Sequence, residues 1–204
     1  MHLNTHSRFS LRYGILSIDQ LLDRAQDMGL ERLALTDIGT TSANWDFVGR
    51  ALARGMSPVL GMDLRNGNQK CFVALAQHPE GYRALCKWVS KHHLDGSPYP
   101  QRLPASVRQS GVAAIYPWRN SPGLPLGANE WLGVQAWELG DLRLAGLDKD
   151  PLLKPHLVGL VHLHLHMQKR LECPSAAAID RPEHLAQPTG SWRLWRPPRL
   201  SSVP

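Results

Sequence analysis

Three side chains in the N-terminal third of the chain, His6, Asp37 and Asp63, are of the types that hold metal ions in enzymes. Imidazole and carboxylate ligands suit Zn or Mn, and clustered metal ions can activate water and neutralise a phosphate group. Three ligands are too few for a site that holds several ions. We therefore expect a structural role, in which His6 and Asp37 form hydrogen bonds to each other or to the backbone.

A second group of possible ligands is the alternating series His162, His164 and His166. On an extended strand the three imidazoles would face one side, an arrangement that suits a metal ion. No acidic or cysteine residue stands between them or directly beside them in the sequence. Adventitious metal binding is therefore the favoured interpretation.

Aromatic and basic residues are interleaved near the C-terminus, where Trp192 and Trp195 stand among Arg193, Arg196 and Arg199. Such a pattern could stack on single-stranded bases. The segment around it weakens this interpretation, because half of the 16 prolines fall in residues 151–204 and no periodicity is sustained there. A disordered, solvated tail is favoured over a nucleic-acid-binding one, although its net positive charge would suit phosphate backbones.

The composition is typical of one globular domain in a reducing, cytoplasmic setting. Of the 204 residues, 43% are hydrophobic and 20% are charged, with a net charge of +6. No apolar run approaches the roughly 20 residues that span a bilayer, and no signal peptide is evident, so no membrane association is expected. The odd number of cysteines, without Cys-x-x-Cys spacing, argues against a disulfide framework or a structural zinc site: Cys71, Cys86 and Cys173.

The elements that must position His6, Asp37 and Asp63 alternate between helices and strands. Ser17 and Gln20 form a capping box at the start of a helix that ends at Gly29. A short apolar strand at 33–35 and a second strand at 59–62 lead to the two aspartates. This order predicts a parallel α/β sheet or barrel. The side chains expected on the buried face of the first helix are Ile18, Leu21, Leu22, Ala25 and Met28.

A second helix is predicted between these strands, capped by Ser42 or Asn44 and ending at Gly55. Its expected inward residues are Trp45, Val48 and Ala51. Together with Leu21 and Leu22 of the first helix, Val48 should cover buried strand residues, namely Leu33, Leu35, Val59, Leu60, Val73 and Leu75.

The second half of the chain adds further strands. Asn66-Gly67 predicts a type I′ hairpin turn before residues 71–75. Residues from Pro79 onward predict a helix that buries Tyr82, Leu85 and Val89. Residues 94–111 read as a surface loop, and the later strands are expected at 112–116, 131–135 and 157–161.

Four ordered segments carry a resemblance to a known family: Asn4-Thr5-His6-Ser7, Leu35-Thr36-Asp37, Pro58-Val59-Leu60-Gly61 and Ala76-Gln77-His78-Pro79-Glu80-Gly81-Tyr82. They resemble the PHP (polymerase and histidinol phosphatase) domain at the N-terminus of bacterial DNA polymerase III alpha subunits, over about residues 1–160. The resemblance implies an α/β fold, a distorted (β/α)7 barrel that is incomplete here, with the site at the C-terminal ends of its strands. It also implies a PHP domain at residues 1–165, followed by a disordered or out-of-frame tail at 166–204.

The resemblance further implies that the metal site is vestigial. Where the family pattern has His-x-His, Thr-Asp-His-Gly and a Glu, this sequence has Asn4, Ile38 and Asp63, beside the retained His6 and Asp37. A further family Asp is missing near Tyr13. An amide is a poor ligand for transition metals and Ile38 is none at all. No cofactor is expected, and Zn, Mn or Mg would bind only if the PHP site were active.

The function implied is that of an N-terminal PHP domain fragment of a replicative DNA polymerase III alpha subunit, a DNA-directed DNA polymerase of DNA replication. A chain without the polymerase palm should be catalytically inactive on its own. The implied partners are the remainder of the alpha subunit, a proofreading exonuclease subunit, and DNA through the full-length polymerase. The alternatives are a stand-alone metal-dependent PHP phosphoesterase and a scaffold that binds a partner protein.

Overall fold

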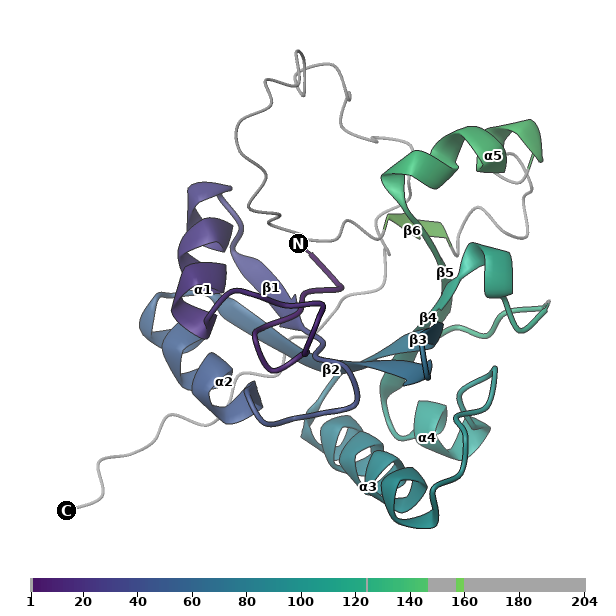
Figure 1. Cartoon of the computed structure of the whole chain (residues 1–204), viewed down its shortest axis with the longest axis horizontal. Helices are drawn as coiled ribbons and strands as arrows, with labels where there is room; N and C mark the ends of the chain where they lie inside the picture. Colours follow the sequence, from purple (N-terminus) through teal and green to yellow (C-terminus); the bar gives the residue numbers. More distant parts are fainter. Residues whose placement is uncertain (1, 124, 147–156, 160–204) are drawn as a thin grey trace.

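The computed structural model describes residues 2–123, 125–146 and 157–159. The tail at 166–204, the series His162, His164 and His166, and the Trp192 segment all lie outside the described residues. Figure 1 shows the described part as a mixed sheet with helices on its outer side. None of the helices in these ranges is long and apolar enough to cross a membrane.

Among the described residues, six strands form one sheet in the order β1-β2-β3-β4-β5-β6. Neighbours β1–β2, β4–β5 and β5–β6 are parallel, whereas β2–β3 and β3–β4 are antiparallel. The sheet curls into an open half-barrel (Figure 1), so the predicted (β/α)7 barrel is confirmed only as a curled mixed α/β fold. The strand bounds are β1 Arg32–Leu35, β2 Ser57–Asn66, β3 Gln69–Ala76, β4 Val112–Pro117, β5 Glu130–Val134 and β6 Leu157–Gly159.

The N-terminal segment runs beside β1 and extends the sheet at that edge. The amide of Ala34 donates to the carbonyl of His2 at 3.0 Å, and the amide of Thr36 donates to the carbonyl of Thr5 at 2.9 Å. His2 also forms a parallel bridge with Leu33. This pairing places His6 next to the end of β1.

Helix α1 (Ile18–Asp27) begins with the predicted capping box, in which Ser17 and Gln20 bond reciprocally. Its predicted apolar face is buried except for Met28, which is 51% exposed and was wrongly placed inward. Met28 is the C-cap residue, where the backbone leaves helical geometry before Gly29. The roughly 3.6-residue periodicity of the helix therefore does not determine where the Met28 side chain points.

Helix α2 (Asn44–Ala53) packs on the same side of the sheet, but the predicted inward face was wrong in one respect. Trp45 is 86% exposed and Phe47 is fully buried in its place. Side chains two residues apart in a helix point in directions that differ by about 200° around its axis. Only one of Trp45 and Phe47 can therefore face the sheet. Neither predicted side-chain cap forms, since the N-cap is Ala43.

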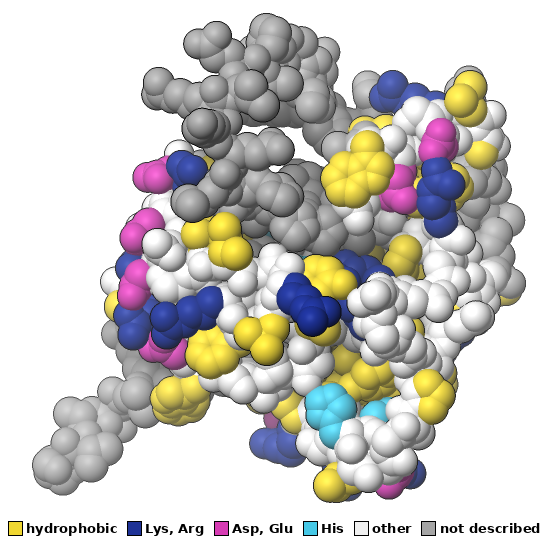
Figure 2. All heavy atoms as spheres, in the orientation of Figure 1, with side chains coloured by type: hydrophobic (Ala, Val, Ile, Leu, Met, Phe, Trp, Pro, Cys, Tyr) yellow, Lys and Arg dark blue, Asp and Glu magenta, His cyan; other side chains and the backbone are white. Residues whose placement is uncertain are grey.

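Salt bridges bind the exposed sides of α1 and α2 to each other. Arg50 contacts Asp19 and Asp46, and Arg54 contacts Asp19 and Asp23. Figure 2 shows basic and acidic side chains intermixed on the part of the surface that lies over α1 and α2. Exposed pairs of this kind contribute little each, so the two helices are held mainly by their buried faces.

Helix α3 (Pro79–Asp95) packs against the same outer face of the sheet as α1 and α2, with Leu85 and Val89 buried as predicted and Tyr82 only half-buried. The predicted surface loop at 94–111 instead contains helix α4 (Ala105–Gln109). Leu103 and Val107 there are buried beneath α3, because they complete that apolar cluster. The remaining short elements are η1 (Trp118–Asn120), η2 (Ala136–Glu138) and α5 (Leu139–Leu144).

The β2–β3 hairpin forms at the predicted place with a different turn. The two loop residues are Gly67 and Asn68, since Asn66 pairs with Gln69. A type I′ turn needs positive φ at both loop residues, and only Gly67 has one, at 61°. The type I′ prediction was therefore wrong.

The buried strand residues divide between the two faces of the sheet. Val73 and Leu75 belong to the cluster around Leu3, whereas Phe72 and Ala74 belong to the cluster under α3. Of the predicted buried strand residues, Leu60 is only half-buried, and so is Val48 on α2. The others are buried as expected, namely Leu33, Leu35, Val59, Val73 and Leu75.

Candidate functional site

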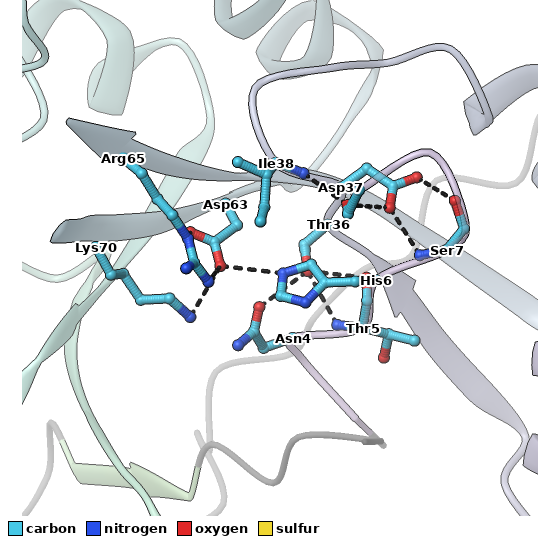
Figure 3. Close-up of polar contacts among 11 residues, drawn as sticks. Asn4, Thr5, His6, Ser7, Thr36, Asp37, Ile38, Asp63, Arg65 and Lys70 are labelled. Atoms are coloured by element: carbon cyan, nitrogen blue, oxygen red, sulfur yellow. Dashed lines mark hydrogen bonds and ion pairs between the residues drawn. The ribbon is translucent and has the colours of Figure 1, made fainter. Parts of the chain in front are cut away.

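Strand pairing brings the three predicted ligand-type residues together. Ile38 forms a parallel bridge with Asp63, and the amide of Asp63 donates to the carbonyl of Asp37 at 3.2 Å. The segment that carries His6 pairs with β1 beside them. Figure 3 shows the resulting cluster, in which side chains of the N-terminal segment, the end of β1 and the β2–β3 hairpin point toward one another.

The carboxylate of Asp63 is the centre of this cluster. Its side chain has no solvent exposure, and His6 Nε2 lies 3.0 Å from its Oδ2 atom. Arg65 donates through Nη2 to Oδ2 at 2.8 Å and through Nε to Oδ1 at 3.0 Å. Lys70 Nζ lies 2.9 Å from Oδ2. A guanidinium, an amino group and an imidazole therefore surround one buried carboxylate.

These contacts decide the charge state of Asp63. Burial by itself would raise the pKa of Asp63, but hydrogen bonds from His6 and Arg65 and the charges of Lys70 and Arg65 outweigh it. The pKa of Asp63 is therefore held well below its usual range, and the carboxylate stays ionised. Burial lowers the pKa of Lys70, an effect that the neighbouring Asp63 opposes.

Asp37 serves as an anchor for the turn that follows His6. Its Oδ1 atom accepts from the Ser7 amide at 2.7 Å and from the Ser10 hydroxyl at 2.6 Å, and its Oδ2 atom accepts from the Ser7 hydroxyl at 2.6 Å. The prediction that His6 and Asp37 bond to each other was wrong, since His6 contacts Asp63. The predicted bond from Asp37 to backbone is confirmed at the Ser7 amide.

The two positions with altered ligands lie in the same cluster. Asn4 is buried, and its Oδ1 atom accepts a hydrogen bond from the Thr36 hydroxyl at 3.2 Å. The Thr36 hydroxyl in turn accepts from the Thr5 amide at 3.0 Å. Ile38 presents a half-buried aliphatic side chain beside Asp63. Asn4 thus holds strands together where the family pattern has a histidine.

Tyr13, near which the family pattern has an Asp, also belongs to the cluster. The guanidinium carbon of Arg65 lies 4.1 Å from the centre of the Tyr13 ring, a cation–π contact. The Tyr13 ring meets His6 edge-on, with 6.3 Å between ring centres. An aromatic ring therefore covers one face of the Arg65 guanidinium.

Sequence reasoning found His6, Asp37 and Asp63 but missed Arg65 and Lys70. Two signals pointed to them. Residues two apart on a strand share a face, which places Arg65 beside Asp63. Lys70 lies across the predicted hairpin turn and pairs with Arg65.

The residues present do not fit a metal centre of the family kind. One imidazole and two carboxylates remain, and both carboxylates already accept several hydrogen bonds or ion pairs from the protein. A divalent ion at Asp63 would approach two fixed positive charges, which repel it. Within residues 2–123, 125–146 and 157–159, no group of three or more His, Cys, Asp or Glu side chains is arranged to hold an ion.

Comparison with known proteins agrees with the resemblance. The family model described as "PHP domain" matches residues 2–115, more than half of the sequence, and the chain belongs to this family. It is 34% identical over 90 residues to the DNA polymerase III subunit alpha of Ureaplasma parvum, a match that covers 44% of this chain and 9% of that protein. It is 30% identical over 117 residues to the corresponding subunit of Treponema pallidum, covering 50% of this chain and 10% of that protein.

The chain therefore carries a PHP domain related to the N-terminal PHP region of DNA polymerase III alpha subunits. The matched region is about a tenth of the length of these relatives. Among solved structures, a putative metal-dependent phosphoesterase from Bifidobacterium adolescentis matches with a TM-score of 0.34 and 13% identity, covering 72% of this chain and 76% of that one.

Proposed function

We propose that this chain is a catalytically silent PHP module of the DNA polymerase III alpha type, with a structural role in DNA replication. The observation that carries the proposal is the state of Asp37 and Asp63. Both carboxylates are buried and bonded to protein donors, where an active site would present them to metal ions. Asn4 and Ile38 stand at two further ligand positions and offer no substitute ligand of comparable strength.

The proposed partners follow from the polymerase relatives. The first is the remainder of an alpha subunit, because the curated relatives are about ten times longer than the matched region. The second is a separate proofreading exonuclease, for which the module would provide a docking surface. Contact with DNA would then be made through the full-length polymerase, and no polymerase chemistry is assigned to the described residues.

The competing function is a stand-alone PHP phosphoesterase. It would need Asp63 to exchange Arg65 and Lys70 for metal ions, and Asp37 to release Ser7 and Ser10. Each exchange breaks buried, charge-assisted contacts that cost several kcal/mol to lose. The donor set therefore favours the silent module.

A hydrolysis assay separates the two functions. The purified full chain is first treated with EDTA, then reloaded with Zn²⁺, Mn²⁺ or Mg²⁺ and assayed on p-nitrophenyl phosphate and on a single-stranded oligonucleotide with a free 3′ end. We expect no hydrolysis above the buffer blank, and the same result for His6→Ala. The matched control is His93→Ala, an exposed histidine outside the cluster. Metal-dependent hydrolysis that His6→Ala abolishes and His93→Ala retains would favour the phosphoesterase instead.

A further inference from the structure

Lys70 is unusual because its ammonium is buried. The side chain starts on β3 and reaches across the hairpin to Asp63, where Nζ lies 2.9 Å from Oδ2. Only 14% of the Lys70 side chain is exposed to solvent. Within the described part of the chain, Asp63 is the one carboxylate in ion-pair contact with it. Figure 3 shows the lysine approaching the carboxylate from the side of the hairpin.

A buried lysine needs a strong compensating contact, and so does the buried carboxylate that faces it. Taking either charge out of water costs several kcal/mol, and a close opposite charge offsets that cost. Arg65 already binds Asp63 through two nitrogen atoms, and His6 contacts the same Oδ2 atom. Lys70 therefore adds positive charge next to the Oδ2 atom of Asp63. In a metal site, the bound ion supplies the positive charge beside such a carboxylate.

We infer that the ammonium of Lys70 is a built-in cation that occupies the place of a metal ion beside Asp63. The hairpin thus carries its own counter-charge, and the fold of the site does not depend on an ion from solution. A second consequence concerns the space that Lys70 fills. If its side chain is shortened to alanine, one of the two positive charges that repel an ion from Asp63 is removed, and Arg65 remains. Asp63 and His6 carry atoms of the metal-ligand type, so a divalent cation can then enter the vacated space beside them.

This inference rests on the proposed function in one respect, the lack of a resident metal, and it makes a separate claim about stability. The test measures the melting temperature of the full chain in EDTA and in millimolar Mn²⁺ or Zn²⁺. The wild type should melt at the same temperature in all three conditions. Lys70→Ala should melt roughly 6–15 °C lower in EDTA, because a buried ion pair has lost one partner. It should regain a large part of that loss with Mn²⁺ or Zn²⁺.

Lys70→Met is the matched control, since methionine fills much of the same space without a charge. It should be destabilised like Lys70→Ala but should not respond to metal, because its side chain still blocks the cavity. The double variant Asp63→Asn/Lys70→Met should be more stable than Lys70→Met alone, since removal of the carboxylate removes the unpaired charge. This comparison remains informative if Lys70→Ala does not fold.

The results that would overturn the inference are distinct from those that would overturn the proposed function. A Lys70→Met variant as stable as the wild type, a Lys70→Ala variant that folds but gains nothing from metal, or a wild type stabilised by Mn²⁺ or Zn²⁺ would each contradict it. None of these melting results reports on catalysis. The proposed function fails only if the wild-type chain hydrolyses a phosphoester.

Discussion

Nε2 of His6 and Oδ2 of Asp63 lie 3.0 Å apart, although 57 residues separate them in the sequence. The contact ties the N-terminal segment to β2 inside the curl of the sheet. It also engages the imidazole of His6, which the resemblance to the PHP family aligns with a metal-ligand position. An imidazole, which could bind a metal ion, here instead connects the N-terminal segment to β2, next to the pairing of that segment with β1.

The core beneath α1 and α2 should be sensitive to the loss of one side chain. Leu35 on β1 is fully buried in the cluster that these helices cover. Leu35→Ala should lower the free energy of unfolding by roughly 2–5 kcal/mol through the cavity it leaves. Urea denaturation measures this change. The control Leu94→Ala, at a position 87% exposed, should lie within about 0.5 kcal/mol of the wild type.

Removal of the Asp37 carboxylate should release the turn that it anchors. Asp37→Ala leaves the Ser7 amide and the Ser7 and Ser10 hydroxyls without their buried acceptor, which should destabilise the domain by roughly 2–4 kcal/mol. Arg8 and Arg12 lie in or beside this turn and are exposed, so trypsin reports its opening. We expect faster cleavage at these two arginines than in the wild type.

Asp27→Ala provides the matched control for that experiment, because Asp27 is an exposed aspartate at the end of α1. Its rate of cleavage at Arg8 and Arg12 should equal that of the wild type. Equal rates for Asp37→Ala and the wild type would show that the carboxylate does not hold the turn.

Stability should fall in acid partly because of Glu130. This buried carboxylate on β5 contacts Arg102 and Arg108 and accepts hydrogen bonds from Tyr116 and the Gly127 amide. Burial would raise the pKa of Glu130, but the Arg102 contact and these hydrogen bonds lower it to about 2. Because the folded-state pKa is depressed, the contribution is complete above the unfolded pKa, near 4.5, and is lost as the pH falls toward 2.

Comparison with Glu130→Gln isolates this contribution from that of the other acids. The wild type should exceed the variant in free energy of unfolding at pH 6, and the difference should shrink as the pH is lowered from about 4.5 to about 2. Denaturation at fixed pH values across this range measures the difference. If the difference in free energy of unfolding did not change with pH, the ionised form of Glu130 would contribute nothing, and only the packing of its side chain would stabilise the fold.

Much of the fold could be predicted because short-range rules decide it. Ser17 and Gln20 specify a helix start through atoms within one turn, and the apolar run ending at Leu35 specifies a buried strand. The hairpin was placed correctly, yet its turn type was not, because the pairing of Asn66 with Gln69 moved the loop by one residue. Trp45 and Phe47 compete for the same helix face, and only packing against the sheet chooses between them.

The site was predicted less completely, since its contacts join distant segments. His6, Asp37 and Asp63 could be identified from residue type and motif, but the choice of Asp63 over Asp37 as the partner of His6 depends on how the N-terminal segment lies against β1. Arg65 and Lys70 have no motif of their own. Their role appears only when the register of the hairpin sets them around one carboxylate.

We infer that protein cations stand in place of metal ions in this PHP domain, and the metal content of the purified full chain is the decisive measurement. The protein is purified without chelator, dialysed against metal-free buffer, and measured for Zn, Mn, Fe and Mg per mole of protein. We expect far less than one equivalent of any of these metals, because Arg65 and Lys70 already neutralise Asp63. Two or more equivalents of tightly held Zn, Mn or Fe would contradict it.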